Sequence, residues 1–471
     1  MARHEESVDT KETVSLKTKL AYGAGDMGAG ITATIEAFVF LVFLTNVAGL
    51  PAGIAGTVLL VGRIWDAIND PIVGFLSDRT RGLREHTKLP FRRRHSWMII
   101  GSIPFGLTFF LLWFVPEFSQ NQAANQTWLF IYYTAMFILF DTAYTAVNLP
   151  YTALTPEITK DYDQRTKLTS FRFAFSIGGS VLALALGSGF SILFPEPGQK
   201  ELQYIILGAV CAVLSVLPIY WCVWGTKEEY NKKRQSETPW KKQIITIITN
   251  KPFLFVIAIY LFSWLAFQLT SAIIPYYVKY WIGVDQFFQV ALVVQVSAAC
   301  MLFIWSRISD KLGKKGVYFI GMTIWIAAQI GLFFLNQDQI ILMYIFAILA
   351  GCGVAIAYLI PWSMLPDVID LDELRTGERR EGIFYSFMIL FQKAGLGLGV
   401  FIAGIALDVA GFVEASGNQQ IPEQPETALT VIRIIAGPVP GLLLIGGIVL
   451  TFFYPITRKI HTEHINKLEK Q

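Results

Sequence analysis

Two carboxylates one helical turn apart lie inside a strongly apolar stretch of this sequence. Asp66 and Asp70 belong to the segment from Arg63 to Pro71, in which most of the remaining residues are apolar. At about 100° per residue, Arg63, Asp66 and Asp70 share one face of a helix. Two such carboxylates repel each other unless a cation lies between them or one is protonated. Hard oxygen ligands suit a small cation such as Na⁺, and also a proton. The pair therefore predicts a monovalent-cation site, whereas a structural ion pair with Arg63 would explain only one aspartate.

Neutral oxygen atoms precede a proline in a later apolar stretch. Thr142, Thr145 and Asn148 are spaced three residues apart, just before Pro150. A proline inside a helix frees a backbone carbonyl, which adds a further oxygen. These groups are candidate ligands for a cation or a polar solute. Hydrogen bonding between packed helices is the alternative, and the segment fits both interpretations.

Single charged residues lie in other apolar stretches, where each is a functional candidate because burial of its charge is costly. Lys393 lies deep inside its stretch and could reach a carboxylate in the first half of the chain; extension to the membrane surface is the alternative. Arg172 lies nearer the start of its stretch, so both interpretations apply to it. Asp26 lies among glycines and could be a gate or a packing contact as well as a ligand. Glu36 and Asp408 are isolated acids without an evident partner. Asp141 comes directly before Thr142, and its role is ambiguous.

The elements that must position these residues are apolar segments long enough to cross a membrane. The chain has 471 residues, of which 54% are hydrophobic and only 15% charged. About 20 apolar residues span a bilayer, and only helices satisfy their backbone there in this pattern. We predict an all-α polytopic membrane protein with twelve transmembrane helices, near residues 20–47, 52–76, 97–115, 127–153, 169–193, 203–225, 252–281, 286–307, 317–335, 338–362, 382–410 and 428–455.

Lysine and arginine are concentrated in alternate loops, which predicts the orientation. The loops 77–96 and 363–381 and the central loop are basic, whereas 116–126 and 411–427 contain neither residue. The basic side is predicted to be cytoplasmic, with both termini on it, in a plasma or inner membrane. The expected divisions are a tail (1–19), a six-helix bundle (20–225), a central loop (226–251), a second six-helix bundle (252–455) and a C-terminal tail (456–471).

The two halves repeat short motifs at matching positions. Asp78 and Arg79 follow the second stretch, and Asp310 with Lys311 follows the eighth. These charges are expected either to form latches of an inner gate or only to set the topology. Two parallel six-helix repeats around a central site are similar to the plan of major facilitator transporters.

Several function classes are disfavoured by composition. A net charge of +3 gives no reason to expect nucleic acid as a partner. All five histidines lie in the termini or in the 77–96 segment, and the four cysteines show no metal-ligand spacing, so we expect no enzyme. The intramembrane acids are too few and too asymmetric for a channel. No cofactor is expected besides a coupling ion.

The motifs named above resemble those of the glycoside–pentoside–hexuronide:cation symporters, of which melibiose permease is the best-known member. The resemblance rests on the segments from Tyr22 to Asp26, Arg63 to Pro71, Leu89 to Arg94 and Leu149 to Thr155, and on Lys393. It implies the major facilitator fold and transport of a sugar or glycoside coupled to Na⁺, Li⁺ or H⁺.

The resemblance also implies roles for individual residues. Asp66 and Asp70 resemble the carboxylates that bind Na⁺, and Asn69 and Thr145 resemble further members of that cation site. Arg63 and Lys393 are expected to couple cation binding to the conformational change. The expected substrate-binding residues are Arg172, Asn148, Lys393, Asp26 and Thr152.

Departures from melibiose permease concern the sugar site. Gly30 and Asn148 stand where that permease has galactoside-binding aspartates, and Thr152 replaces a stacking tryptophan. Pentoside and hexuronide carriers resemble the Asn148 pattern more closely. Animal sodium-dependent lysolipid carriers share the acidic pair, so an amphipathic substrate is the alternative, as is an uncoupled exchanger or facilitator. The protein is expected to function as a monomer.

Overall fold

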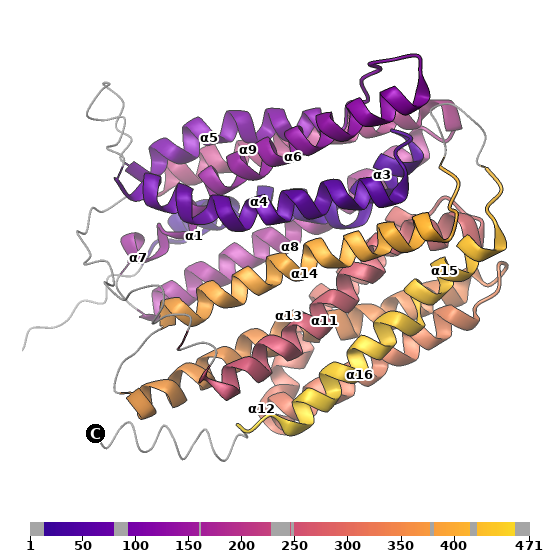
Figure 1. Cartoon of the computed structure of the whole chain (residues 1–471). Coiled ribbons are helices and arrows are strands. Elements are labelled where there is room, and N and C mark those ends of the chain that lie inside the picture. The colour runs from indigo at the N-terminus through magenta and orange to yellow at the C-terminus, as the bar shows by residue number, and fades with distance from the viewer. Residues whose placement is uncertain are drawn as a thin grey trace, which may run out of the picture.

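The computed structural model describes residues 14–79, 93–159, 162–227, 245, 249–376, 381–414 and 422–456, and every regular element in these ranges is a helix. Ten helical segments are long and apolar enough to cross a membrane. The long helices α4 and α5 complete the twelve, so the predicted all-α, twelve-helix major facilitator fold is confirmed (Figure 1).

The first half of the chain forms six of these spans. Its first span is built from consecutive short helices, and the others are single helices. The helices are α1 (Leu16–Ala24), α2 (Met27–Ile35), the π-helix η1 (Glu36–Phe40), α3 (Leu41–Asn46), α4 (Ala52–Arg79), α5 (Arg93–Leu111), α6 (Gln122–Thr152), the short α7 (Thr155–Ile158), α8 (Tyr162–Leu193), the 3₁₀-helix η3 (Pro197–Gln199) and α9 (Lys200–Gly225).

The second half forms the other six spans. Its helices are α11 (Lys251–Tyr276), the π-helix η4 (Tyr277–Ile282), α12 (Phe287–Phe334), α13 (Ile340–Thr376), α14 (Glu381–Val409), α15 (Glu426–Ala436) and α16 (Pro438–Phe453). Two spans are joined in α12 across Gly313, whose φ of 72° only glycine adopts readily.

Several helix ends differ from the prediction. α13 continues to Thr376 rather than ending near residue 362, and it contains both Pro361 and Pro366. α8 starts at Tyr162, before the predicted residue 169. α5 starts at Arg93, so His95 is buried inside a helix, 3.1 Å from the Thr226 hydroxyl. Hydropathy indicates only the part of a helix that lies in lipid. These helices continue beyond that part, so their ends could not be predicted from hydropathy.

The two halves contact each other closely along α4 and α14. A Cβ atom at Gly404 of α14 would lie 2.5 Å from the Ala52 carbonyl oxygen and 3.1 Å from Gly56 Cα. At Gly397 it would lie 2.8 Å from Arg63 Cβ. Small residues allow helix backbones to approach this closely in membranes. This contact places the charged face of α4 directly against the second half.

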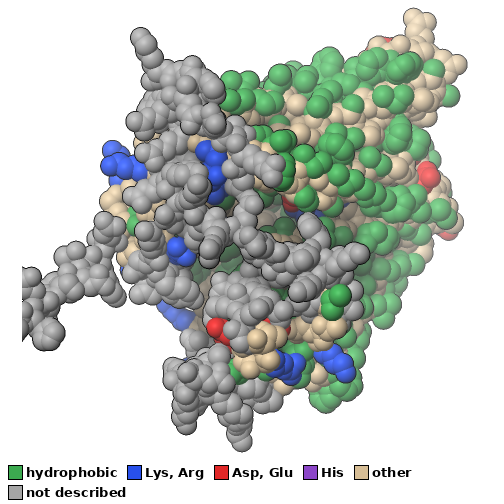
Figure 2. Space-filling model, turned by 60° about the vertical axis from the view of Figure 1, so that its left-hand side comes forward, with side chains coloured by type: hydrophobic (Ala, Val, Ile, Leu, Met, Phe, Trp, Pro, Cys, Tyr) green, Lys and Arg blue, Asp and Glu red, His purple; other side chains and the backbone are tan. Residues whose placement is uncertain are grey.

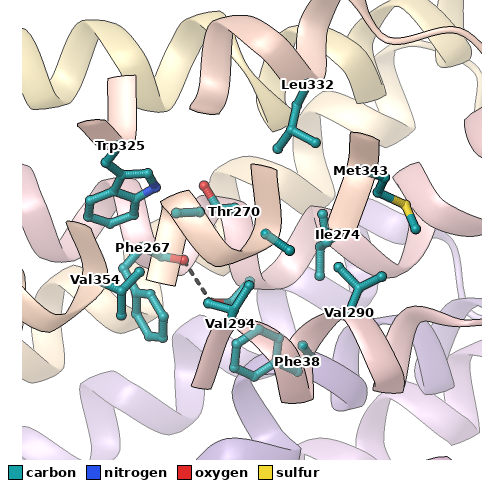
Figure 3. A pocket seen from close by; sticks show the side chains of 14 residues that line it. Phe38, Phe267, Thr270, Ile274, Val290, Val294, Trp325, Leu332, Met343 and Val354 are labelled. Carbon is teal, nitrogen blue, oxygen red and sulfur yellow. Dashed lines mark hydrogen bonds between the residues drawn. The ribbon is translucent and has the colours of Figure 1, made fainter. Parts of the chain in front are cut away.

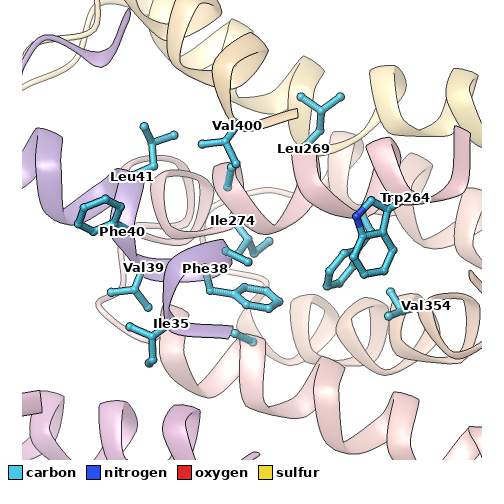
Figure 4. Packing of buried hydrophobic residues seen from close by; sticks show 14 of the residues in the cluster. Ile35, Phe38, Val39, Phe40, Leu41, Trp264, Leu269, Ile274, Val354 and Val400 are labelled. Carbon is cyan, nitrogen blue, oxygen red and sulfur yellow. The ribbon is translucent and has the colours of Figure 1, made fainter. Parts of the chain in front are cut away.

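Apolar packing also crosses between the halves at η1. Figure 4 shows Phe38 of η1 pointing toward Ile274 and Trp264 of the second half. The Phe38 and Phe267 rings meet edge to face, with centroids 6.0 Å apart. Many large apolar side chains elsewhere are exposed, and Figure 2 shows them covering the flank of the helices, as expected for a surface in contact with lipid.

The halves are joined at the end opposite the basic loops, which we call the outer side. Thr45 and Tyr276 share a hydrogen bond of 2.7 Å, and the Tyr280 hydroxyl donates to Asn46 over 3.1 Å. The Ala52 N–H donates to a Glu414 carboxylate oxygen over 3.2 Å. We call these contacts the outer seal. At the other end, α4 and α11 diverge (Figure 1), and the surface is hollowed between the halves (Figure 2).

Candidate functional site

The two carboxylates of α4 hold the ammonium of Lys393 between them. The Lys393 Nζ lies 2.9 Å from Asp66 Oδ2 and 2.5 Å from Asp70 Oδ2. Lys393 belongs to α14, so the prediction that it joins the two halves is confirmed. Thr145 of α6 donates to Asp70 Oδ1 at 3.2 Å and lies 3.4 Å from Asp66 Oδ1. Four of the residues predicted for cation binding and coupling therefore meet at one place.

Asn69 and the Ala67 carbonyl are further polar groups in the same stretch of α4. Asn69 is buried, and its side-chain amide points to the Asp141 carbonyl oxygen at 3.5 Å. Pro71 lies inside α4 and has no N–H, so the Ala67 carbonyl lacks its usual helical partner. Carboxylate, hydroxyl and carbonyl oxygens of this kind are ligands for hard cations.

Arg63 lies at the centre of a second group of acids. Its guanidinium pairs with Glu36 of η1 and lies 3.5 Å from Asp141 and 3.7 Å from Asp66. The predicted pairing with one α4 aspartate is thus one of three contacts. Glu36, which showed no evident partner in the sequence, is part of this group, and so is Asp141. A basic partner stabilises a buried acid, and the sequence offers Arg63 and Arg172 as partners of Glu36 without deciding between them.

Asp26 and Arg172 pair with each other across α2 and α8. Arg172 Nε lies 3.1 Å from Asp26 Oδ2, and the guanidinium lies 5.7 Å from the centre of the Tyr151 ring. Tyr151 in turn stacks on Tyr22, with ring centroids 5.1 Å apart. About a quarter of the Arg172 side chain is exposed, whereas Asp26 is buried, and the pair neutralises itself.

The remaining predicted substrate residues lie near the inner end of α6. Asn148 donates to the Tyr144 hydroxyl over 3.2 Å. Thr152 donates to the Leu149 carbonyl of its own helix over 2.9 Å. Both are half-buried. Their roles in substrate binding stay predictions.

The predicted gating residues Asp78, Arg79 and Asp310 have side chains outside the described residues. Nearby ion pairs are described at the same end of the molecule. Lys314, just after the Gly313 bend, lies 2.7 Å from Asp367 of α13. Arg94 of α5 donates to Glu157 of α7 over 2.5 Å. Both pairs tie helices together within one half.

A small apolar cavity of about 30 Å³ lies between α11, α12 and α13. Figure 3 shows Phe38, Phe267, Trp325 and Val354 around it. The Trp264 ring lies 5.4 Å from the ring of Phe267, one of the lining residues, and 3.4 Å from the Cβ position of Gly395 on α14. Sequence analysis did not identify this cavity, because its lining looks like ordinary apolar helix.

Comparison with known proteins identifies the family. The profile of the family described as MFS/sugar transport protein matches residues 21–458. The chain belongs to this family. It is 42% identical to an uncharacterized symporter of Synechocystis sp., with 97% of each chain covered. It is also 30% identical to sodium-dependent lysophosphatidylcholine symporter 1-B of Danio rerio, over 98% of this chain and 90% of that protein.

Solved transporter structures share the fold of this family member. A D-xylose–proton symporter superposes with a TM-score of 0.64 at 13% identity, covering 93% of this chain and 97% of that one. The xylose transporter XylE from E. coli, in an inward-open conformation, gives 0.61 at 14% identity, covering 96% and 98%. The chain is therefore a major facilitator symporter embedded in a membrane, and its relatives are transporters rather than enzymes. These comparisons leave the melibiose-permease-like subfamily as a prediction.

Proposed function

We propose that this protein couples the movement of a cation, Na⁺ in the first place, to uptake of an organic solute by alternating access. The observation that carries the proposal is the Lys393 ammonium lying between Asp66 and Asp70. A positive charge already occupies the position where a coupling cation would bind. Sodium is favoured over a proton because relatives across almost the whole chain are named as sodium-dependent symporters.

The mechanism follows from this competition. A cation that enters between Asp66 and Asp70 neutralises them and releases Lys393 from the pairing that joins α4 and α14. The freed ammonium is then available to a substrate in the central space. Enclosing Asp66 and Asp70 without either the Lys393 ammonium or a cation between them is costly. The protein therefore changes orientation only when it is empty, with Lys393 paired, or fully loaded with cation and substrate. Cation and substrate must each raise the affinity for the other by the same factor.

A sugar or glycoside is our first candidate substrate. The family description names sugar transport. The first half carries polar side chains such as Arg172 and Asn148, and the second half carries a cluster of aromatic side chains. Trp264 and Tyr358 of that second half meet edge to face, with centroids 5.2 Å apart. Hydroxyl-rich solutes bind between such hydrogen-bonding groups and ring faces.

An amphipath of the lysolipid type is the second candidate, and the named relatives favour it. Its anionic head would pair with the Lys393 ammonium once a cation has displaced that ammonium from Asp66 and Asp70. Named lysophosphatidylcholine symporters cover 98% of the chain.

Uptake into proteoliposomes tests the proposal. An inward Na⁺ gradient should drive accumulation of a radiolabelled sugar or of lysophosphatidylcholine, each offered alone and in competition. Asp70→Asn should abolish the Na⁺ stimulation while the protein still inserts, and Asp338→Asn, in an exposed loop, should leave it unchanged. Uptake that responds only to a pH gradient would replace Na⁺ by H⁺. Uptake indifferent to both gradients would leave a facilitator or exchanger.

The orientation, compartment and assembly are part of the same proposal. The basic side faces the cytoplasm, both termini lie there, the membrane is the plasma or inner membrane, and one chain is the working unit. The distribution of lysine and arginine in the loops supports the orientation.

A further inference from the structure

The charges inside the membrane-spanning part of the molecule do not balance. Within the described residues around α4, four carboxylates are grouped with only two basic side chains: Glu36, Asp66, Asp70 and Asp141 with Arg63 and Lys393. Asp66 belongs to both sets of contacts, so this is one connected cluster. If all six groups are ionised, it carries two net negative charges. One bound Na⁺ would still leave one negative charge in a region surrounded by apolar helices, which is strongly unfavourable.

Asp141 is the acid with the poorest compensation. Its side chain is 1% exposed, and neither of its carboxylate oxygens accepts a hydrogen bond. Arg63 Nη1 approaches it only to 3.5 Å, since the same guanidinium is also paired with Glu36. Buried carboxylates normally accept hydrogen bonds on their oxygens. The free oxygens of Asp141 are aimed into the cluster and are suited to a cation.

The position of Asp141 separates it from the first cation site. It lies one helical turn before Thr145 on α6, whereas Thr145 contacts the Asp70 carboxylate. The group around Lys393 and the group around Arg63 therefore form two levels, joined by Asp66. Each level holds one basic side chain among carboxylates that outnumber it.

We propose that a second monovalent cation binds at the level of Asp141, with Asp141, Glu36 and Asp66 as its carboxylate ligands. This inference rests on the proposed Na⁺ coupling and deepens it, because it sets two cations per cycle. The second cation displaces Arg63 from Asp141, as the first displaces Lys393 from Asp70. With both cations bound, the cluster is neutral and can be enclosed during the change of orientation.

Sodium binding to the purified full-length protein tests this inference. Calorimetric titration with NaCl, at constant ionic strength kept with choline chloride, should show two Na⁺ per wild-type chain. Asp141→Asn should bind one, and Asp338→Asn, with the same change in an exposed loop, should bind two. If Asp141→Asn fails to fold, Glu36→Gln provides the second variant, with one Na⁺ expected. The Na⁺ dependence of wild-type uptake should be sigmoidal, with a Hill coefficient near two.

One Na⁺ per wild-type chain would overturn the second site, as would two Na⁺ in Asp141→Asn or, where that variant does not fold, in Glu36→Gln. Neither result would touch the coupling proposed above, since Na⁺-driven uptake would persist in the wild type. Failure of the coupling itself would appear differently, as uptake that ignores the Na⁺ gradient.

Discussion

Of the two basic side chains in the charged cluster, Lys393 is the one that contacts both α4 carboxylates. Its ammonium bonds to both Asp66 and Asp70 and is partly exposed to the space between the halves. Any cation that binds between the carboxylates must displace it. The lysine is therefore both a neutralising partner in the empty protein and a competitor of the coupling ion.

Replacing this competitor should tighten cation binding. In Lys393→Gln we expect the dissociation constant for Na⁺ to fall about tenfold, which corresponds to about 1.4 kcal/mol, because the ion pair that opposes Na⁺ is absent. Calorimetry at constant ionic strength measures this change. Lys200→Gln is the matched control, since Lys200 pairs with Asp285 on the outer side. Equal or weaker Na⁺ binding in Lys393→Gln would contradict the competition.

Much of the site could be predicted from residue type and spacing. The pair Asp66 and Asp70 and the reach of Lys393 follow from helical periodicity and from the cost of a lone charge in lipid. The roles of Glu36 and Asp141 could not be predicted, because their nearest base depends on how η1, α4 and α6 pack. Asp26 and Arg172 were each identified, but their mutual pairing also depends on tertiary packing.

At the scale of elements, the approach of α4 and α14 depends on glycine. Gly404 leaves no room for a side chain beside the Ala52 carbonyl and Gly56. Both helices carry members of the charged cluster. Their separation therefore sets how well Lys393 reaches the α4 carboxylates.

A single added methyl group should disturb this contact. Gly404→Ala places a carbon 2.5 Å from a backbone oxygen, so the backbones must move apart. We expect a loss of about 1–3 kcal/mol, as for other overpacked positions, visible as a lower midpoint of thermal unfolding in detergent. Gly189→Ala is the control, because nothing lies within 4 Å of its Cβ position. It should be neutral or stabilising by about 0.5–1 kcal/mol. Equal shifts in both variants would refute the argument.

The number and order of the spans could be predicted from hydropathy, whereas their ends could not. Hydropathy predicts that the tenth span ends near residue 362, yet α13 runs through Pro361 and Pro366 to Thr376. A proline removes one backbone hydrogen bond and bends a helix, and the packing of α13 on neighbouring helices sustains it beyond that point. The basic loops are correspondingly shorter than the sequence indicated.

At the scale of the whole molecule, the outer seal and the hollow on the basic side define one orientation of the transport cycle. Thr45 is fully buried in the seal, whereas Asn148 is half-buried near the inner end of α6. Water should reach Asn148 from the basic side, whereas it should not reach Thr45 from the outer side.

Thiol labelling in oriented vesicles measures this difference. In a variant without the four native cysteines, a membrane-impermeant maleimide applied to the basic side should label Asn148→Cys. Applied to the outer side, it should leave Thr45→Cys unlabelled until Na⁺ and substrate are added. Rapid labelling of Thr45→Cys from the outer side in their absence would show that the resting orientation is the opposite one.

The chemistry of the outer seal has a consequence for the medium outside. The hydrogen bonds of Tyr276 with Thr45 and of Tyr280 with Asn46 join neutral groups, and Phe412 packs on both tyrosine rings. Dissolved salt screens charges but leaves neutral hydrogen bonds nearly unchanged. The exposed pair of Lys200 and Asp285 adds only about 0–1 kcal/mol. Closure by these neutral contacts should therefore be nearly as firm in dilute fresh water as in brine, and within the outer seal salt should weaken only the contribution of the Glu414 carboxylate, which accepts from the Ala52 N–H.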